Sequence, residues 1–175
     1  MTLASLGVGA QARAMTEMEA AALNVELAAR TCLQNYQHPA GLLEAFKTAG
    51  FDYSTEDFGG GQVLHWFATP DNTVSTAITI NEISVECRIG TGLWGTEAML
   101  PFAAALMAKI APNVALNTGS PEGANVMPGT VPAQNGACSG FHAFIPRTVL
   151  WVQIERQGND GTCISDGTSV MRMMF

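Results

Sequence analysis

The sequence predicts an α+β fold in which helices pack on one face of an antiparallel sheet of five or six strands. Apolar residues recur every three or four positions in some stretches, which indicates helices, and at every second position in others, which indicates strands. The strand-like stretches follow one another in runs, and this order favours antiparallel pairing over a parallel α/β sheet. A chain of 175 residues fits one domain with one core, which we assign to residues 15–175.

A capping box begins the first predicted helix. Thr16 takes the N-cap position and Glu19 follows three residues later, so that each side chain can bond the backbone N–H of the other residue. The residues expected on the buried face are spaced by four and three positions: Met18, Ala22, Val25, Ala29, Cys32 and Tyr36. Cys32 therefore belongs to the predicted core.

Two shorter helices are predicted further along the chain. Pro39 suits the first turn of the second helix and Gly50 suits its end. The third helix covers residues 96–110 and ends before Pro112. The apolar residues expected to face the core are Leu42, Leu43, Phe46 and Ala49 in the second helix, and Leu100, Ala103, Ala104 and Met107 in the third.

Period-two patterns predict the strands. They cover residues 62–69, 73–80, 83–90, 141–145, 148–155 and 168–175. Pro70, Asp71 and Asn72 form a hairpin turn between the first two. In the third strand, the residues that share one apolar face are Ile83, Val85, Cys87 and Ile89. The acidic residues Asp52, Glu56 and Asp57 are assigned to a loop before the first strand.

A long segment at residues 113–140, rich in Gly, Pro, Asn and Ala, is predicted to be a loop. Loops of this length are uncommon inside domains, and loops on a rigid scaffold often carry binding residues. The polar and flexible side chains that could contact a partner or ligand are Asn117, Glu122, Asn125, Met127 and Gln134. The alternative is that the loop is only mobile, because Gly and Pro suit a plain linker equally well.

Four cysteines, none of them in a Cys-x-x-Cys pair, predict two disulfides. Cys32 and Cys87 lie on apolar faces that must meet in the core, so we expect them to pair. Cys138 is expected to pair with Cys163, because the strand at residues 141–145 and its return along 148–155 bring both cysteines to one end of the sheet.

Cys138 also has a second interpretation. The pattern Gly136-x-Cys138-x-Gly140 is how many hydrolases present a nucleophile at a turn between a strand and a helix. Here a loop precedes Cys138 and a strand is predicted after it, and a catalytic thiol needs a reducing environment or a lowered pKa. We therefore predict no catalytic residue and keep a cysteine-dependent hydrolase using Cys138 as the alternative.

Residues 1–14 are small and apolar and end in Ala12-Arg13-Ala14, a small-x-small pattern that signal peptidases recognise. We interpret them as a truncated signal peptide, the alternative being a disordered tail. This start and the even cysteine count predict a periplasmic or secreted protein. We expect no membrane span, because the sequence holds no apolar run long enough to cross a bilayer.

Composition excludes several classes of function. The net charge is −7 and the eight Lys and Arg residues form no cluster, so we expect no nucleic-acid binding. His38, His65 and His142 lack ligand spacing, and the methionines near the C-terminus fit an ordinary core strand better than a copper site. The Gly-rich residues 58–62 lack the Lys-Ser/Thr of a phosphate loop. We predict no metal and no cofactor.

These observations favour a non-enzymatic exported module of the binding or inhibitor type. Its partner, a protein or a small molecule, is not specified by any motif. The acidic surface favours a basic protein.

Overall fold

The computed structural model describes residues 14–57, 59–82, 84–110, 116–119, 137–145, 148–155 and 167–175. Within them the helices are α1 (Glu17–Asn35), α2 (Pro39–Thr48) and α3 (Thr96–Ile110). The strands are β1 (Asp52–Asp57), β2 (Val63–Ala68), β3 (Ser75–Ile80), β4 (Val85–Thr91), β5 (Leu116–Gly119), β6 (Ala137–Ile145), β7 (Thr148–Glu155) and β8 (Ser169–Met174). The predicted α+β class is confirmed.

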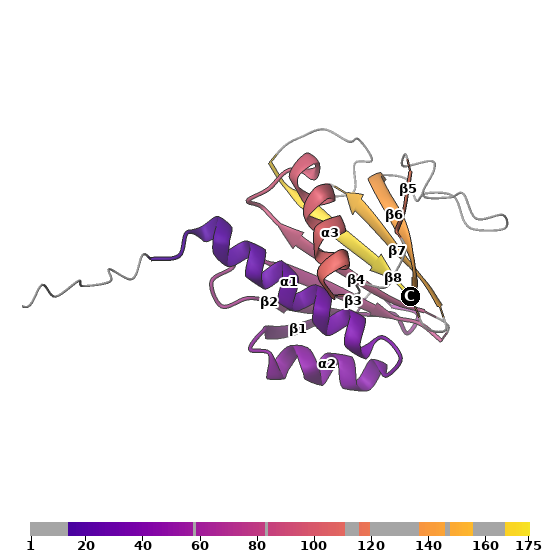
Figure 1. The fold of residues 1–175 in the computed structure, drawn as a ribbon. Coiled ribbons are helices and arrows are strands. Elements are labelled where there is room, and N and C mark those ends of the chain that lie inside the picture. Colours follow the sequence, from indigo (N-terminus) through magenta and orange to yellow (C-terminus); the bar gives the residue numbers. More distant parts are fainter. Residues whose placement is uncertain are drawn as a thin grey trace, which may run out of the picture.

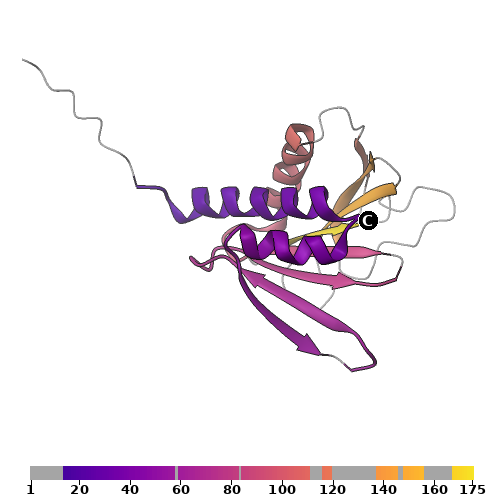
Figure 2. The same cartoon turned by 90° about the horizontal axis from the view of Figure 1, so that it is seen from below.

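All the strands join in one antiparallel sheet with the order β1-β2-β3-β4-β8-β7-β6-β5. Each half of the sheet is a meander of consecutive strands, and the two halves meet where β4 pairs with β8 (Figure 1). The three helices lie on the same face of the sheet, as Figures 1 and 2 show from two directions. α1 packs on β4, and α3 packs on β6, β7 and β8.

The core lies between this helix layer and the sheet. Alternate residues of the central strands point into it: Cys87 and Ile89 of β4, Met171 and Met173 of β8, and Val152 and Ile154 of β7, all of them buried. The apolar face predicted for β4 is confirmed for Val85, Cys87 and Ile89, which are all buried.

The sheet is larger than predicted, with eight strands in the described ranges instead of five or six. The residues of β1 include Asp52, Glu56 and Asp57, for which the sequence predicts a loop. β1 is an edge strand paired only with β2, and in Figure 2 this hairpin diverges from the helix layer, so all six residues are exposed and no apolar alternation marks it. β5, only four residues long, lies inside the predicted loop 113–140, and β6 begins at Ala137, within the same segment.

The capping box of α1 is confirmed. The Thr16 backbone N–H donates to Glu19 Oε2 at 2.8 Å, and the Glu19 N–H donates to Thr16 Oγ1 at 3.2 Å. The predicted buried face is correct for Val25, Ala29 and Cys32. It is wrong for Met18, which is 58% exposed because the first turn of α1 borders an open groove.

The other two helices begin and end close to the predicted residues. α3 has the predicted bounds, and Ala103 and Met107 are buried as predicted. Leu100 and Ala104 are only half-buried, because the core side of the helix also includes Met99 and Leu106. In α2, Leu42 and Phe46 are buried and Ala49 is exposed, because Ala49 is already the C-cap. Gly50 follows with a φ of 90°, as the prediction of a glycine helix end requires.

The predicted disulfide between Cys32 and Cys87 is present. It joins α1 to β4 with a Cα–Cα distance of 6.6 Å, and both residues are fully buried. Among the described residues it is the one disulfide, where the sequence predicted two. Cys163 and the side chain of Cys138 lie outside the described residues, so their pairing stays a prediction.

The predicted turn between β2 and β3 is confirmed. The Asn72 N–H donates to the Thr69 carbonyl at 2.8 Å, and Asn72 has a φ of 56°. Asp71 accepts bonds from Thr73 of the same turn and from Asn24 Nδ2 of α1 at 3.1 Å. These hydrogen bonds join α1 to the hairpin of β2 and β3.

None of the helices in the described part of the chain has the length and apolar character that crossing a membrane needs.

Candidate binding groove between α1 and α3

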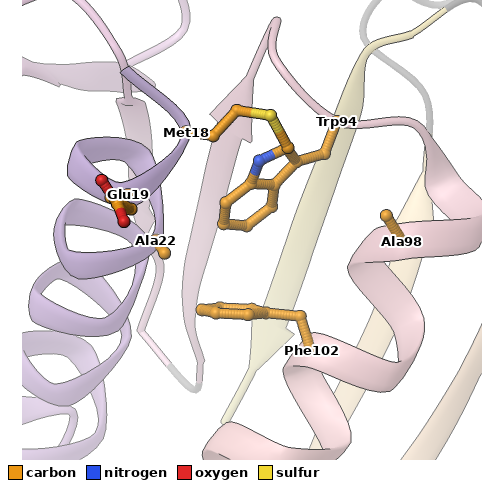
Figure 3. Close-up of a pocket in the computed structure, with 6 residues that line it drawn as sticks. All are labelled: Met18, Glu19, Ala22, Trp94, Ala98 and Phe102. Atoms are coloured by element: carbon orange, nitrogen blue, oxygen red, sulfur yellow. The ribbon is translucent and has the colours of Figure 1, made fainter. Parts of the chain in front are cut away.

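An open groove of about 310 Å³ lies between the first two turns of α1 and the first two turns of α3. Its lining is almost entirely apolar. The residues that form it are Met18, Glu19, Ala22, Trp94, Ala98 and Phe102 (Figure 3). The groove therefore lies between α1, whose start is fixed by the capping box, and α3, which connects the two meanders.

Trp94 and Phe102 form the rigid wall of the groove. Trp94 lies in the short connection between β4 and α3, and Phe102 follows on the second turn of α3. Their ring centroids are 4.9 Å apart with the planes inclined by 54°, and Trp94 is only 8% exposed. Just after Trp94, the Gly95 carbonyl accepts the N–H groups of Ala98 and Met99, which starts α3 and fixes the indole relative to the helix.

Met18 contributes a flexible side chain to the α1 side of the groove. Figure 3 shows its side chain extending from α1 across the groove toward Trp94. A thioether side chain with three rotatable bonds adjusts to different apolar surfaces, so methionine is common where a site must accept varied partners. Its 58% exposure leaves it available for contact.

One acidic residue, Glu19, lines the groove. Residues 14–22 and 93–102, which contribute its walls, contain Glu17, Glu19 and Glu97 and no Lys, Arg or His. The N–H and hydroxyl groups of Thr16 bond the Glu19 carboxylate, and this holds its pKa below the ordinary value. Glu19 is therefore ionised at neutral pH.

Exposed apolar side chains gather on and beside α1. Of the seven large hydrophobic residues that are exposed in the described ranges, four lie there. They are Met15, Met18, Leu23 and Leu27. Of these four residues Met18 lines the groove, whereas Leu23 and Leu27, five and nine residues further along, lie on a different side of the helix.

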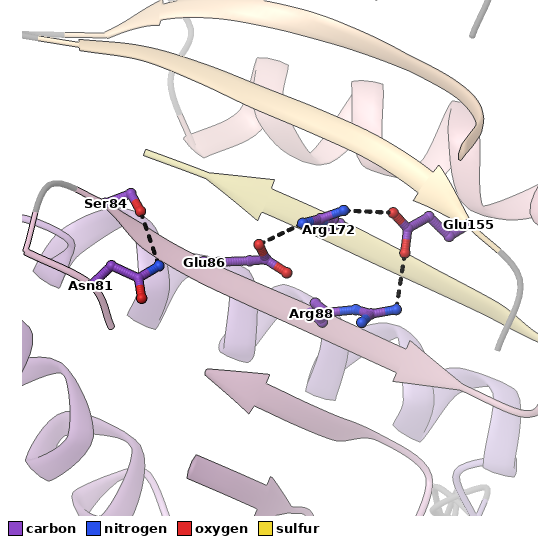
Figure 4. Close-up of polar contacts among 6 residues, drawn as sticks. All are labelled: Asn81, Ser84, Glu86, Arg88, Glu155 and Arg172. Atoms are coloured by element: carbon purple, nitrogen blue, oxygen red, sulfur yellow. Dashed lines mark hydrogen bonds and ion pairs between the residues drawn. The ribbon is translucent and has the colours of Figure 1, made fainter. Parts of the chain in front are cut away.

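A charged cluster occupies the opposite face of the sheet (Figure 4). Arg172 of β8 bonds Glu86 of β4 at 2.6 Å and Glu155 of β7 at 3.3 Å, and Arg88 of β4 bonds Glu155 at 3.1 Å. The four charges sum to zero and neutralise one another, so the cluster joins three strands and leaves no net charge to attract a ligand. We assign it a structural role.

The histidines do not form a metal site in the part of the chain that is described. His38 precedes α2, and the side chain of His142 is outside the description. His65 lies 3.0 Å from the Tyr53 hydroxyl through Nδ1, and burial lowers its pKa, so it is neutral at pH 7. Within these ranges no three His, Cys, Asp or Glu side chains gather in a way that could hold a metal ion.

Of the five residues predicted to bind a partner, one lies in the described ranges. Asn117 is on β5, in register with His142 of β6, and does not belong to a loop. The other four, Glu122, Asn125, Met127 and Gln134, lie outside the described residues, so the prediction for them is untested. Sequence reasoning missed the groove because periodicity assigned Met18 to the core. The sequence feature that could have indicated the groove is the pair of methionines Met15 and Met18 at the start of α1.

The backbone around Cys138 differs from a nucleophile turn. Cys138 lies inside β6, beside an irregularity in register between Ala137 and Ser139, and β6 continues to Ile145 before β7. A nucleophile turn needs a helix directly after the reactive residue. Gly140 has a separate explanation, because a Cβ at this position would overlap the backbone carbonyl oxygen of Val152 on β7.

Comparison with protein-family models, curated proteins and solved structures gives no match to this chain.

Proposed function

We propose that this protein is a non-enzymatic binding module of an oxidising, extracytoplasmic compartment, and that its groove between α1 and α3 receives an apolar side chain of a partner protein. The observation that carries this proposal is the apolar lining open to solvent, with a rigid wall of Trp94 and Phe102 facing the exposed Met18. Buried apolar anchors in pockets supply much of the energy of protein interfaces.

Charge and size support a basic protein segment as the occupant. Glu19 lines the groove and is ionised, so Lys or Arg beside the anchor would be attracted and acidic flanks repelled. A volume of about 310 Å³ is at the small end of ligand pockets and suits one large side chain. The net charge of −7 acts in the same direction at longer range.

The assignment to an exported protein is supported by the buried disulfide between Cys32 and Cys87. Disulfides persist in the periplasm and outside the cell and are rare in the cytosol. The signal-peptide interpretation of residues 1–14 belongs to the same proposal. No observation favours the hydrolase alternative, because β6 runs through Cys138 without a helix after it.

Selection of a displayed library of random peptides on the full chain tests the proposal. We expect enriched peptides to share one aromatic or large aliphatic residue flanked by Lys or Arg. Ala98→Trp should abolish their binding, because Ala98 lines the groove at an exposed position of α3 and a larger side chain fills it.

Ala105→Trp is the matched control. Ala105 is exposed on the same helix, two turns further along, and does not line the groove. Enriched peptides that bind the Ala98→Trp variant as tightly as the unmodified protein would contradict the proposed site. Enrichment of acidic flanks would contradict the proposed partner.

A further inference from the structure

We infer that Met18 is an oxidation site, and that its conversion to the sulfoxide by a peroxide remodels the groove. The inference rests on the groove of the proposed function but concerns the chemistry of the groove itself. Hydrogen peroxide is the co-reactant. One of its oxygen atoms forms a bond to Met18 Sδ, the O–O bond breaks, and the other oxygen leaves as water, so the sulfur is oxidised and the peroxide reduced.

Exposure selects the methionines that can react. Met15 and Met18 are each 58% exposed. The methionines of the core are at most 1% exposed: Met99, Met107, Met171 and Met173. Because oxidation requires contact between the sulfur and the dissolved peroxide, Met15 and Met18 should react well before the core residues. Hydrogen peroxide is neutral, so the negative charge of Glu19 does not repel it.

Position separates Met18 from Met15. Met18 lines the groove and extends toward Trp94, whereas Met15 precedes α1 and is not part of the lining (Figure 3). A sulfoxide carries a strong hydrogen-bond acceptor, and Figure 3 shows the indole nitrogen of Trp94, a donor, on the edge of the ring that faces Met18. Oxidation therefore replaces an apolar contact between Met18 and the indole with a polar one, which changes the α1 side of the groove.

The compartment makes the modification relevant. The proposed compartment preserves the disulfide between Cys32 and Cys87 and contains oxidants. Oxidation there replaces the apolar thioether of Met18 with a polar sulfoxide, and this changes the binding surface. The same two properties, exposure and position in the lining, are not shared by any other methionine in the described ranges.

The test uses the full chain with its disulfide intact and hydrogen peroxide as the reagent, and requires no partner. Peptide mass mapping should show Met15 and Met18 oxidised about tenfold faster than Met99 or Met171. The indole N–H resonance of Trp94, assigned by its loss in Trp94→Phe, should shift when the unmodified protein is oxidised. It should shift equally in Met15→Leu and stay in place in Met18→Leu.

Slow oxidation of Met18, or an indole shift that persists in Met18→Leu, would overturn the inference. A Trp94 resonance that does not move when Met18 is fully oxidised would overturn it as well. These results are separate from those of the peptide selection, because a groove without a protein partner would still show the shift.

Discussion

At the scale of single residues, Gly140 shows how one missing side chain permits a strand contact. It lies on β6 opposite Gln153 of β7, where a Cβ would overlap the carbonyl oxygen of Val152. The obstacle is backbone, which cannot rotate away as a side chain can. The glycine is needed for the close approach of two strands and does not depend on any reaction at Cys138.

We expect Gly140→Ala to lower the free energy of unfolding by about 2 kcal/mol, the usual cost of forcing extra volume into a packed site. Urea unfolding followed by circular dichroism measures this. Gly92→Ala is the control, because a Cβ there would have no heavy atom within 4 Å, and its stability should stay within about 0.5 kcal/mol. Equal stability of the two variants would show that β6 and β7 adjust freely.

At the scale of elements, the disulfide between Cys32 and Cys87 fixes α1 on the sheet. A second link, the Lys109 Nζ–Glu26 Oε1 ion pair at 2.7 Å, joins α1 to α3. Hydrogen bonds from Lys109 and Arg30 lower the pKa of Glu26, so the carboxylate is ionised at neutral pH. This pair is at the surface and contributes little, so the position of α1, and with it the groove, depends mainly on the disulfide and the buried face.

Replacing both cysteines in the variant Cys32→Ala/Cys87→Ala should lower the free energy of unfolding by about 4 kcal/mol. The estimate follows from the entropy that a cross-link spanning 55 residues removes from the unfolded chain. Urea unfolding of the double variant and of the parent protein gives the difference, with the reduced parent as control. A loss below about 1 kcal/mol would show that packing alone positions α1.

A peptide map without reduction tests this pairing and the predicted Cys138–Cys163 pairing together.

At the scale of the whole molecule, the two meanders depend on the junction of β4 with β8. On the helix face Cys87, Ile89, Met171 and Met173 pack across this junction. On the other face Arg172 bridges Glu86 and Glu155, so the ion pairs extend from β4 through β8 to β7 (Figure 4). Arg172 is the cation that two carboxylates share, which makes it the most sensitive position of the cluster.

Arg172→Gln should therefore destabilise the whole domain by about 3 kcal/mol, because it leaves two carboxylates of low exposure without this cation. Differential scanning calorimetry should show one transition at a lower Tm. Arg30→Gln is the control. Arg30 pairs with Glu26 on the surface of α1 at 2.8 Å with 34% of its side chain exposed, and its loss should cost at most about 0.5 kcal/mol. Two separate transitions in Arg172→Gln would mean that the meanders unfold independently.

Prediction from sequence succeeded where a residue's neighbours in the chain decide its structure. The capping box of Thr16 and Glu19, the bounds of α3 and the turn at Asn72 depend on local hydrogen bonds and backbone preferences. The pairing of Cys32 with Cys87 was also predictable, since each cysteine lies on the apolar side of a strongly patterned element. β1 could not be found this way, because an edge strand exposed on both faces carries no apolar alternation.

The sequence by itself determined the α+β class, the helix starts and the buried side of β4, because period and capping are local properties of the chain. Only the tertiary structure decided that β4 pairs with β8, that Arg172 meets Glu86 and Glu155, and that Met18 borders a groove with Trp94. Met18 and Trp94 are 76 positions apart. Which distant surfaces meet depends on how two helices and two meanders pack together, and no window of neighbouring residues contains that information.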